Sequence, residues 1–156
     1  MSLDILLLVQ LLATVGMTAV IWFVQIAHYP LHVLVPEQSF AAYQQAHMYR
    51  VTFVVGPLML VEAAAASWLL LMPLPDNLVW LAWVGFAMVL LVWISTACLQ
   101  VPCHHRLERG YDLQALRRLL ATNWIRTGLW TGRAVIAVMM CVLAWHLSSE
   151  QQGHVI

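Results

Sequence analysis

The sequence predicts an all-α integral membrane protein, a single domain over residues 1–156 in which four helices form an up-down-up-down bundle. Of its residues, 63% are hydrophobic and 9% are charged, whereas about a quarter are charged in soluble domains. A soluble globule of this length could not bury so much apolar surface. Four apolar stretches each reach the roughly 20 residues that cross a bilayer. They are 5–29, 51–72, 78–99 and 124–145.

The first and third stretches are expected to be uninterrupted apolar helices. The stretch 5–29 follows Met1-Ser2-Leu3-Asp4, which lacks the basic segment that opens a signal peptide, so we expect it to remain as a span. The stretch 78–99 contains no charged residue. It follows the turn-forming sequence Pro-Leu-Pro-Asp-Asn at 73–77, so the second and third spans should form a close antiparallel hairpin.

The second and fourth spans each follow an amphipathic segment that is expected to be helical. Ser39 and Asp112 are placed to cap these two helices. We expect both helices to run on into the spans 51–72 and 124–145 and to project beyond the hydrocarbon as extensions of the bundle. The stripe of the first segment, at spacings of three and four, contains Phe40, Tyr43, His47 and Arg50.

The arginines predict the orientation. Six of the seven lie in or beside the long connections 30–50 and 100–123, and the chain contains no lysine. The positive-inside rule therefore places these connections and their helical extensions in the cytoplasm and both termini outside. The expected partner is the lipid bilayer, and a homo-oligomer is left open. The zero formal net charge excludes a nucleic-acid binder that works by bulk positive charge.

The two halves of the chain share a pattern. In each, a span ends near a glutamine, a proline and a histidine, and an arginine near a threonine opens the next span. A parallel internal repeat is one interpretation, and chance similarity between hydrophobic helices is the other. The residues are Gln25, His28, Pro30, Arg50 and Thr52 in the first half and Gln100, Pro102, His104, Arg126 and Thr127 in the second.

Histidine is concentrated at the cytoplasmic ends of the first three spans. His28, His47 and His104, one from each, could converge on a Zn, Fe or Cu ion with an open position left for a ligand. They could instead supply axial ligands to a haem between helices. His28 and His32 are four residues apart, but Pro30 is expected to interrupt the helix between them. The alternative is interfacial histidines bonded to backbone and lipid headgroups.

Ionisable side chains deep in two spans are a second signal. Glu62 and Arg133 each lie roughly 14–16 Å into their spans, where an unpaired charge is costly, so we expect them to form an ion pair. That pair would lock two helices together. Alternatively, the last span lines a pocket for an anionic or quinone-like, oxygen-rich ligand, with an aromatic wall. The stripe that supports this alternative contains Asn123, Arg126, Trp130 and Arg133.

Several phrases of the sequence resemble known families. They are His28-Tyr29-Pro30, residues 43–47, 57–62, 102–104 and 123–133. Over most of the chain they resemble a group of small, uncharacterised bacterial four-span membrane proteins. More distantly, the chain is similar to the anthrone-oxygenase-like membrane family, mainly through its polar last helix that carries Trp and Arg. The resemblance implies a bacterial inner membrane and favours His104 over His105.

Together these observations predict a membrane-embedded, metal- or haem-dependent redox or oxygenase-like enzyme. Its expected substrate is a lipophilic aromatic or quinone-like molecule, whose oxygens Asn123, Arg126 and Arg133 would orient, with Glu62 beside them. Trp130 and Tyr43 are the expected cofactor-binding aromatics. Two alternatives stay open: a non-enzymatic binding or transport protein for a metal, a haem or a small lipophile, and a structural subunit whose arginine-rich face docks a partner or anionic lipid.

Overall fold

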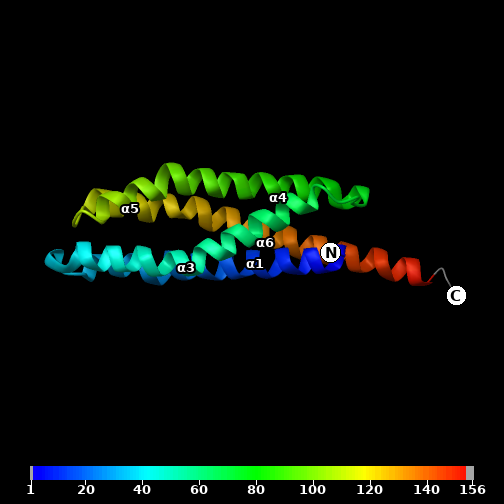
Figure 1. Cartoon of the computed structure of the whole chain (residues 1–156), viewed down its shortest axis with the longest axis horizontal. Helices are drawn as coiled ribbons and strands as arrows, with labels where there is room; N and C mark the ends of the chain where they lie inside the picture. The colour runs from blue at the N-terminus through cyan, green and yellow to red at the C-terminus, as the bar shows by residue number, and fades with distance from the viewer. Residues whose placement is uncertain (1, 154–156) are drawn as a thin grey trace.

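The computed structural model describes residues 2–153, with side chains for 2–149, and this part of the chain is helical with no strand. Four long helical rods lie along a common axis (Figure 1). Each is long and apolar enough to cross a membrane, so the protein is a multi-pass membrane protein. The expected all-α four-helix bundle is confirmed. The rods are Leu3–Leu34, Glu37–Leu69, Asp76–Leu107 and Leu113–Ser149.

The first rod continues through Pro30, so the expected interruption there is wrong. A π-helical turn precedes the proline, and within it the Tyr29 N–H donates to the carbonyl of Val24, five residues back. Pro30 then stands in the first turn of the helical segment that follows, a position that proline tolerates. The elements of this rod are α1 (Leu3–Phe23), the π turn η1 (Val24–His28), α2 (Tyr29–Leu31) and the 3₁₀ turn η2 (His32–Leu34).

The third rod repeats this construction. It consists of α4 (Asp76–Ser95), the π turn η3 (Thr96–Gln100) and α5 (Val101–Leu107), with Pro102 in the first turn of α5. The two π turns are offset by 72 residues along the chain. The same offset relates the two prolines, and also His32 and His104, which each stand two places after a proline. The structure thus supports the internal-repeat interpretation and shows which residues correspond.

The second and fourth rods are the long helices α3 (Glu37–Leu69) and α6 (Leu113–Gly153), which run on into the spans as expected. Asp112 caps α6, because its Oδ1 accepts the Ala115 N–H at 2.9 Å. That hydrogen bond and the Arg106 guanidinium hold the pKa of the Asp112 carboxyl below its usual value. Ser39 does not cap α3. The helix begins two residues earlier, after the extended Pro36, whose carbonyl accepts the Ser39 N–H.

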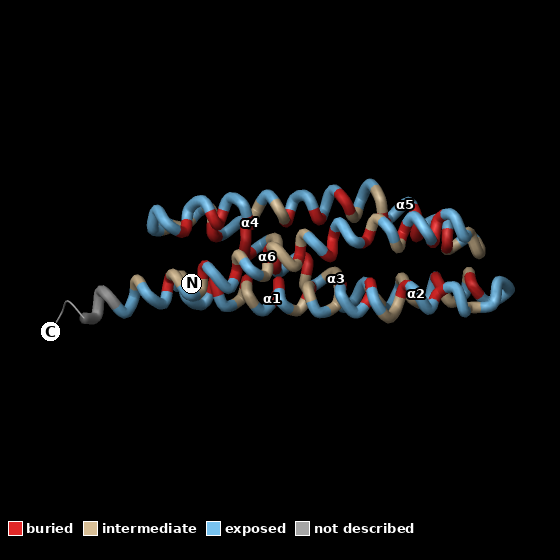
Figure 2. Tube along the Cα trace, turned by 180° about the vertical axis from the view of Figure 1, so that it is seen from behind, coloured by how far each residue is buried: buried red, intermediate tan, exposed pale blue. Residues whose placement is uncertain are grey.

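The helices pack in the cyclic order α1, α3, α4, α6, so that α3 and α6 lie diagonally opposite each other. Figure 1 shows α3 lying along α1 at its start and crossing towards α4 at its end. Buried positions face the bundle axis, and the outward faces are exposed (Figure 2). We call the end with the α3–α4 connection the turn end, and the end with Val35–Pro36 and Glu108–Asp112 the linker end. The functional candidates lie between the middle and the linker end.

Candidate metal centre and adjoining cavity

Three histidines gather at the linker end. His28 closes the π turn, His32 follows one helical turn later, and His47 reaches them from α3. Each offers one ring nitrogen, and these three atoms all lie within 4.8 Å of one another. The His28 and His32 rings meet edge to face at 4.8 Å between centroids, and the His28 and His47 rings lie 4.4 Å apart. This arrangement depends on the helix continuing through Pro30.

The environment of His32 fixes which of its nitrogens is available. The ring is fully buried, and its Nδ1 lies 3.0 Å from the backbone carbonyl of His28. That carbonyl is available because the His32 N–H bonds to Tyr29 instead. A carbonyl can only accept, so Nδ1 carries the proton and Nε2 carries the lone pair. Nε2 is buried beside the Gln44 side chain and forms no well-aligned hydrogen bond with the described residues. A backbone carbonyl that orients the other nitrogen is typical of metal-binding histidines.

His28 and His47 are half-buried and bonded to each other, with 3.0 Å between Nε2 of His28 and Nδ1 of His47. A tetrahedral ion with 2.0–2.1 Å bonds holds its nitrogen ligands roughly 3.3 Å apart. Small ring rotations would therefore convert this hydrogen-bonded pair into two ligands. Tyr43 flanks the cluster, edge-on to the His32 ring at 5.3 Å and parallel to the His47 ring at 6.5 Å.

His104 lies beside this cluster, with its ring centroid 6.3 Å from that of His47. Both of its ring nitrogens are engaged: Nε2 with the Tyr29 hydroxyl at 3.2 Å, and Nδ1 with the Gln44 side-chain amide at 2.8 Å. Of the three expected ligands, the structure brings His28 and His47 together. It adds His32 to them, and it places His104 outside this cluster, next to Tyr29 and Gln44. The four-residue spacing of His28 and His32 was the available signal, and the interruption expected at Pro30 concealed it.

A partly enclosed cavity of about 230 Å³ lies between the histidine cluster and the middle of the bundle. Its walls are mostly apolar, but Arg126, Trp130 and His104 line it, and His47 forms part of its wall. A wider, more open groove of about 800 Å³ follows α1 and α3 on the other side of His47 and reaches His28 and Tyr43. His47 therefore stands between the groove and the cavity, beside the possible ligands of a metal.

Arg126 is held at the cavity by hydrogen bonds to a neutral acceptor. Its Nε donates to Oδ1 of Asn123 at 3.0 Å, and its Nη2 donates to the same oxygen. The Asn123 amide in turn donates to Oε1 of Gln25 at 2.8 Å, which ties α6 to the first π turn. The guanidinium lies 5.9 Å from the centroid of the Trp130 ring. The polar stripe of α6 thus faces the bundle interior.

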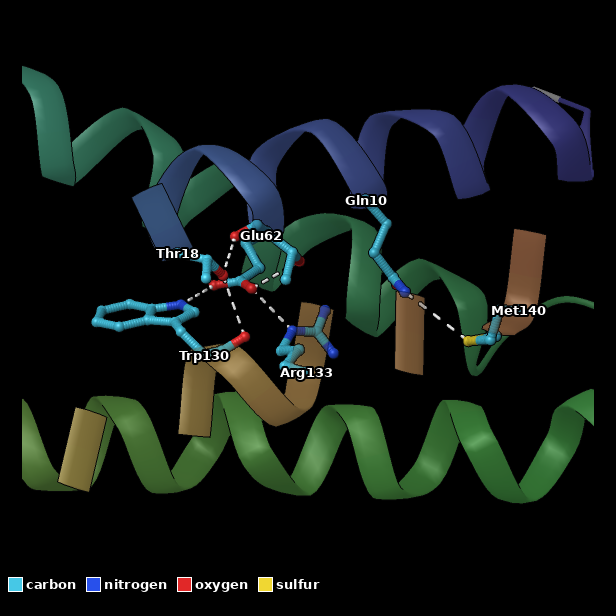
Figure 3. Close-up of polar contacts among 7 residues, drawn as sticks. Gln10, Thr18, Glu62, Trp130, Arg133 and Met140 are labelled. Carbon is cyan, nitrogen blue, oxygen red and sulfur yellow. Dashed lines mark hydrogen bonds and ion pairs between the residues drawn. The ribbon is translucent and has the colours of Figure 1, made fainter. Parts of the chain in front are cut away.

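The expected ion pair between Glu62 and Arg133 is confirmed, with 2.8 Å between Nε and Oε1 across the diagonal of the bundle. Figure 3 shows Glu62 of α3 reaching between Trp130 and Arg133 of α6. Thr14 donates to Oε1 at 2.8 Å, and the Trp130 indole donates to Oε2 at 2.9 Å. Both carboxylate oxygens are therefore occupied. Since these residues are buried in the packed middle of the helices, the arrangement locks three helices together.

Arg133 fits beside α4 because position 85 is glycine. A Cβ atom at Gly85 would lie 2.8 Å from Nη1 of Arg133, closer than such atoms approach. The middle of the bundle therefore depends on a small residue in α4 as well as on the charges. Trp130 connects the two regions, since its N–H bonds to Glu62 while its ring lines the cavity.

Comparison with known proteins found no match among family models, curated proteins or solved structures. The relationship to the anthrone-oxygenase-like family therefore stays a prediction from the sequence phrases.

Proposed function

We propose that the protein is a membrane-embedded metalloenzyme of redox or oxygenase-like type that acts on a small lipophilic molecule. His28, His32 and His47 would hold a transition-metal ion, and the 230 Å³ cavity would hold the molecule beside it. The observation that carries the proposal is that one ring nitrogen from each of these three histidines lies within 4.8 Å of the other two. One of the three rings, that of His32, is fully buried.

The donor set favours a metal ion over a haem. Three neutral imidazoles with a vacant fourth position are typical of catalytic Zn, and imidazole also suits Fe and Cu. A haem takes axial ligands that approach the faces of a flat macrocycle, whereas these three nitrogens cluster around one point. When bound, such an ion supplies Lewis acidity or electrons to an oxygen-bearing ligand. The chain itself would position that ligand with Arg126 and Trp130 and exclude water with apolar walls.

The proposed location is a bacterial inner membrane with the linker end in the cytoplasm and both termini outside. Exposed arginines at the linker end support this orientation, since cytoplasmic ends carry the positive charge. They are Arg106, Arg109, Arg117 and Arg118.

A non-enzymatic binding protein for a metal or small lipophile is the second candidate. It is favoured by the state of Glu62, whose two oxygens are both bonded and which therefore offers no free general base. A turnover assay separates the two candidates. The metal-loaded protein is mixed with a soluble quinol, and the rate of oxygen consumption is measured. Oxygen uptake above that of free metal supports the enzyme, and its absence supports the binding protein.

Metal analysis of the purified full-length protein tests the proposed centre. After loading with Zn²⁺ or Co²⁺ and removal of excess ion, we expect one equivalent in the wild type. His32→Ala should retain essentially none, because it removes the ligand whose free nitrogen is buried. The matched control is His105→Ala, which removes an exposed histidine that pairs with Glu108 at the same end of the bundle. Stoichiometric metal in His32→Ala, or none in the wild type, would contradict the proposal.

A further inference from the structure

Arg126 is a buried cation without a counter-ion. Its side chain is about 7% exposed and lies on a helix that is apolar enough to cross a membrane. Its Nε and Nη2 both donate to the neutral amide oxygen of Asn123. Among the residues with described side chains, the buried carboxylate is Glu62, and Arg133, Trp130 and Thr14 already occupy it. A charge in this position is costly unless something of opposite sign neutralises it.

The cavity beside Arg126 offers the place for such a group. The guanidinium lines it together with the Trp130 ring, and the remaining wall is mainly apolar, with residues such as Met17, Ile21 and Val55. Ligand sites in proteins typically combine apolar walls with a few polar groups that orient the ligand. A cationic group at one side of an apolar cavity therefore selects a molecule with an anionic end and an apolar body.

The volume limits the size of that body. An apolar cavity of about 150 Å³ accommodates benzene, and a water molecule takes about 30 Å³ of liquid volume. The cavity of about 230 Å³ therefore has room for one aromatic ring with one or two small substituents.

We propose that this cavity binds a monocyclic aromatic anion, a benzoate- or phenolate-type molecule, whose charged oxygens pair with Arg126 and whose ring lies against Trp130. The inference deepens the proposed function, because His47 borders both the cavity and the histidine cluster and so would place the ring beside the metal. The inference depends on the proposed enzymatic function only for the chemical fate of the bound molecule. Binding itself depends on Arg126 and the cavity walls and requires no metal.

The test compares benzoate with benzamide, its neutral analogue of nearly equal size, by calorimetry on the metal-free, full-length protein in a zwitterionic detergent. A charge-assisted hydrogen bond to a buried guanidinium should make benzoate roughly tenfold to a hundredfold tighter in the wild type. Arg126→Gln keeps a hydrogen-bonding side chain without the charge, so it should bind the two molecules equally. The matched control is Arg106→Gln, which neutralises an exposed arginine and should keep the full preference.

Equal affinities in the wild type, no benzoate binding, or an undiminished preference in Arg126→Gln would overturn the inference. If Arg126→Gln does not fold, as judged by circular dichroism, the comparison of the two molecules on the wild type decides alone. The outcome is separable from that of the proposed metal centre. Benzoate selectivity in a protein that takes up no metal supports this inference and contradicts the centre, and stoichiometric metal without selectivity does the reverse.

Discussion

The middle of the bundle and its linker end both bury polar side chains, but they treat charge differently. In the middle, the Glu62 carboxylate and the Arg133 guanidinium neutralise each other, and both carboxylate oxygens are bonded. At the linker end, no carboxylate of the described side chains pairs with Arg126, and Nε2 of His32 is buried without a well-aligned hydrogen bond to the described residues. The two regions therefore differ in charge rather than in hydrogen bonding, since Nη2 of Arg133 in the middle also has no hydrogen-bond partner among the described residues. The same bundle therefore contains a structural lock and, towards the linker end, a candidate site whose Arg126 lies about two helical turns from Arg133 along α6.

The backbone differs between the two regions as well. α1 and α4 are regular in the middle of the bundle, whereas both rods contain a π turn towards the linker end. A π turn inserts an extra residue, changes which side chains face inward, and recurs at functional sites. In the first half, the helix that continues after the π turn keeps His28 and His32, which are four residues apart, on one side. In the second half, His104 corresponds to His32 but bonds to Tyr29 and Gln44 inside the bundle. The equivalent histidines of the two halves therefore make different contacts.

Breaking the lock should have the largest effect. Glu62→Ala leaves the Arg133 guanidinium buried and unpaired and removes the acceptor of Trp130, so we expect a loss of roughly 3–5 kcal/mol in the free energy of unfolding. Chemical unfolding in detergent, followed by circular dichroism, measures it. Glu37→Ala, which removes an exposed carboxylate near the start of the same helix, is the matched control and should have little effect. A loss below about 1 kcal/mol for Glu62→Ala would show that the pair is not a lock.

A charge reversal sharpens this result. Glu62→Arg and Arg133→Glu should each be strongly destabilising, and combining them should recover part of the loss because the opposite charges meet again. Recovery is partial, since Thr14 and Trp130 would then face a guanidinium to which they cannot donate. A double variant as unstable as the sum of the two single variants would argue that each residue acts separately.

The linker end should respond to metal instead. At a concentration of Zn²⁺ one hundred times its dissociation constant, the wild type should gain about 2.7 kcal/mol in the free energy of unfolding. His32→Leu should lose this gain completely. In a chelator, however, its stability should remain within about 1–2 kcal/mol of the wild type, because the buried imidazole left one nitrogen unsatisfied. If His32→Leu in a chelator were as unstable as Glu62→Ala, the distinction between a lock and a site would fail.

Glycine substitutions give the smallest and most local test. Gly85→Ala places a Cβ atom 2.8 Å from Nη1 of Arg133, so we expect a loss of about 1–3 kcal/mol in the free energy of unfolding. Gly128→Ala in α6 meets no atom within 4 Å and should be neutral or stabilising by up to about 1 kcal/mol, since alanine favours the helix. Parallel unfolding curves of the two variants make the comparison. Equal stability would mean that Arg133 moves freely.

Much of the architecture follows from the sequence. The four spans, the hairpin at residues 73–77 and the cap at Asp112 depend on hydrophobicity and local hydrogen bonding, which neighbouring residues settle. The pairing of Glu62 with Arg133 could also be predicted, although their helices are diagonal, because charges at matching depth in an apolar layer have few alternatives. The start of α3 was predicted wrongly at Ser39, since Pro36 sets the entry of the chain.

The sequence by itself determined that this protein crosses a membrane, where its helices turn, and that its deep charges pair. Only the tertiary structure decided which histidines meet, because the sequence does not show that the helix continues through Pro30 or that His47 of α3 packs against His28. It also decided that Arg126, unlike Arg133, has no carboxylate beside it among the described side chains. Both arginines lie on one stripe of α6. The opposite helix α3 presents a carboxylate to Arg133, whereas Arg126 bonds to the Asn123 amide of its own helix and lines the cavity.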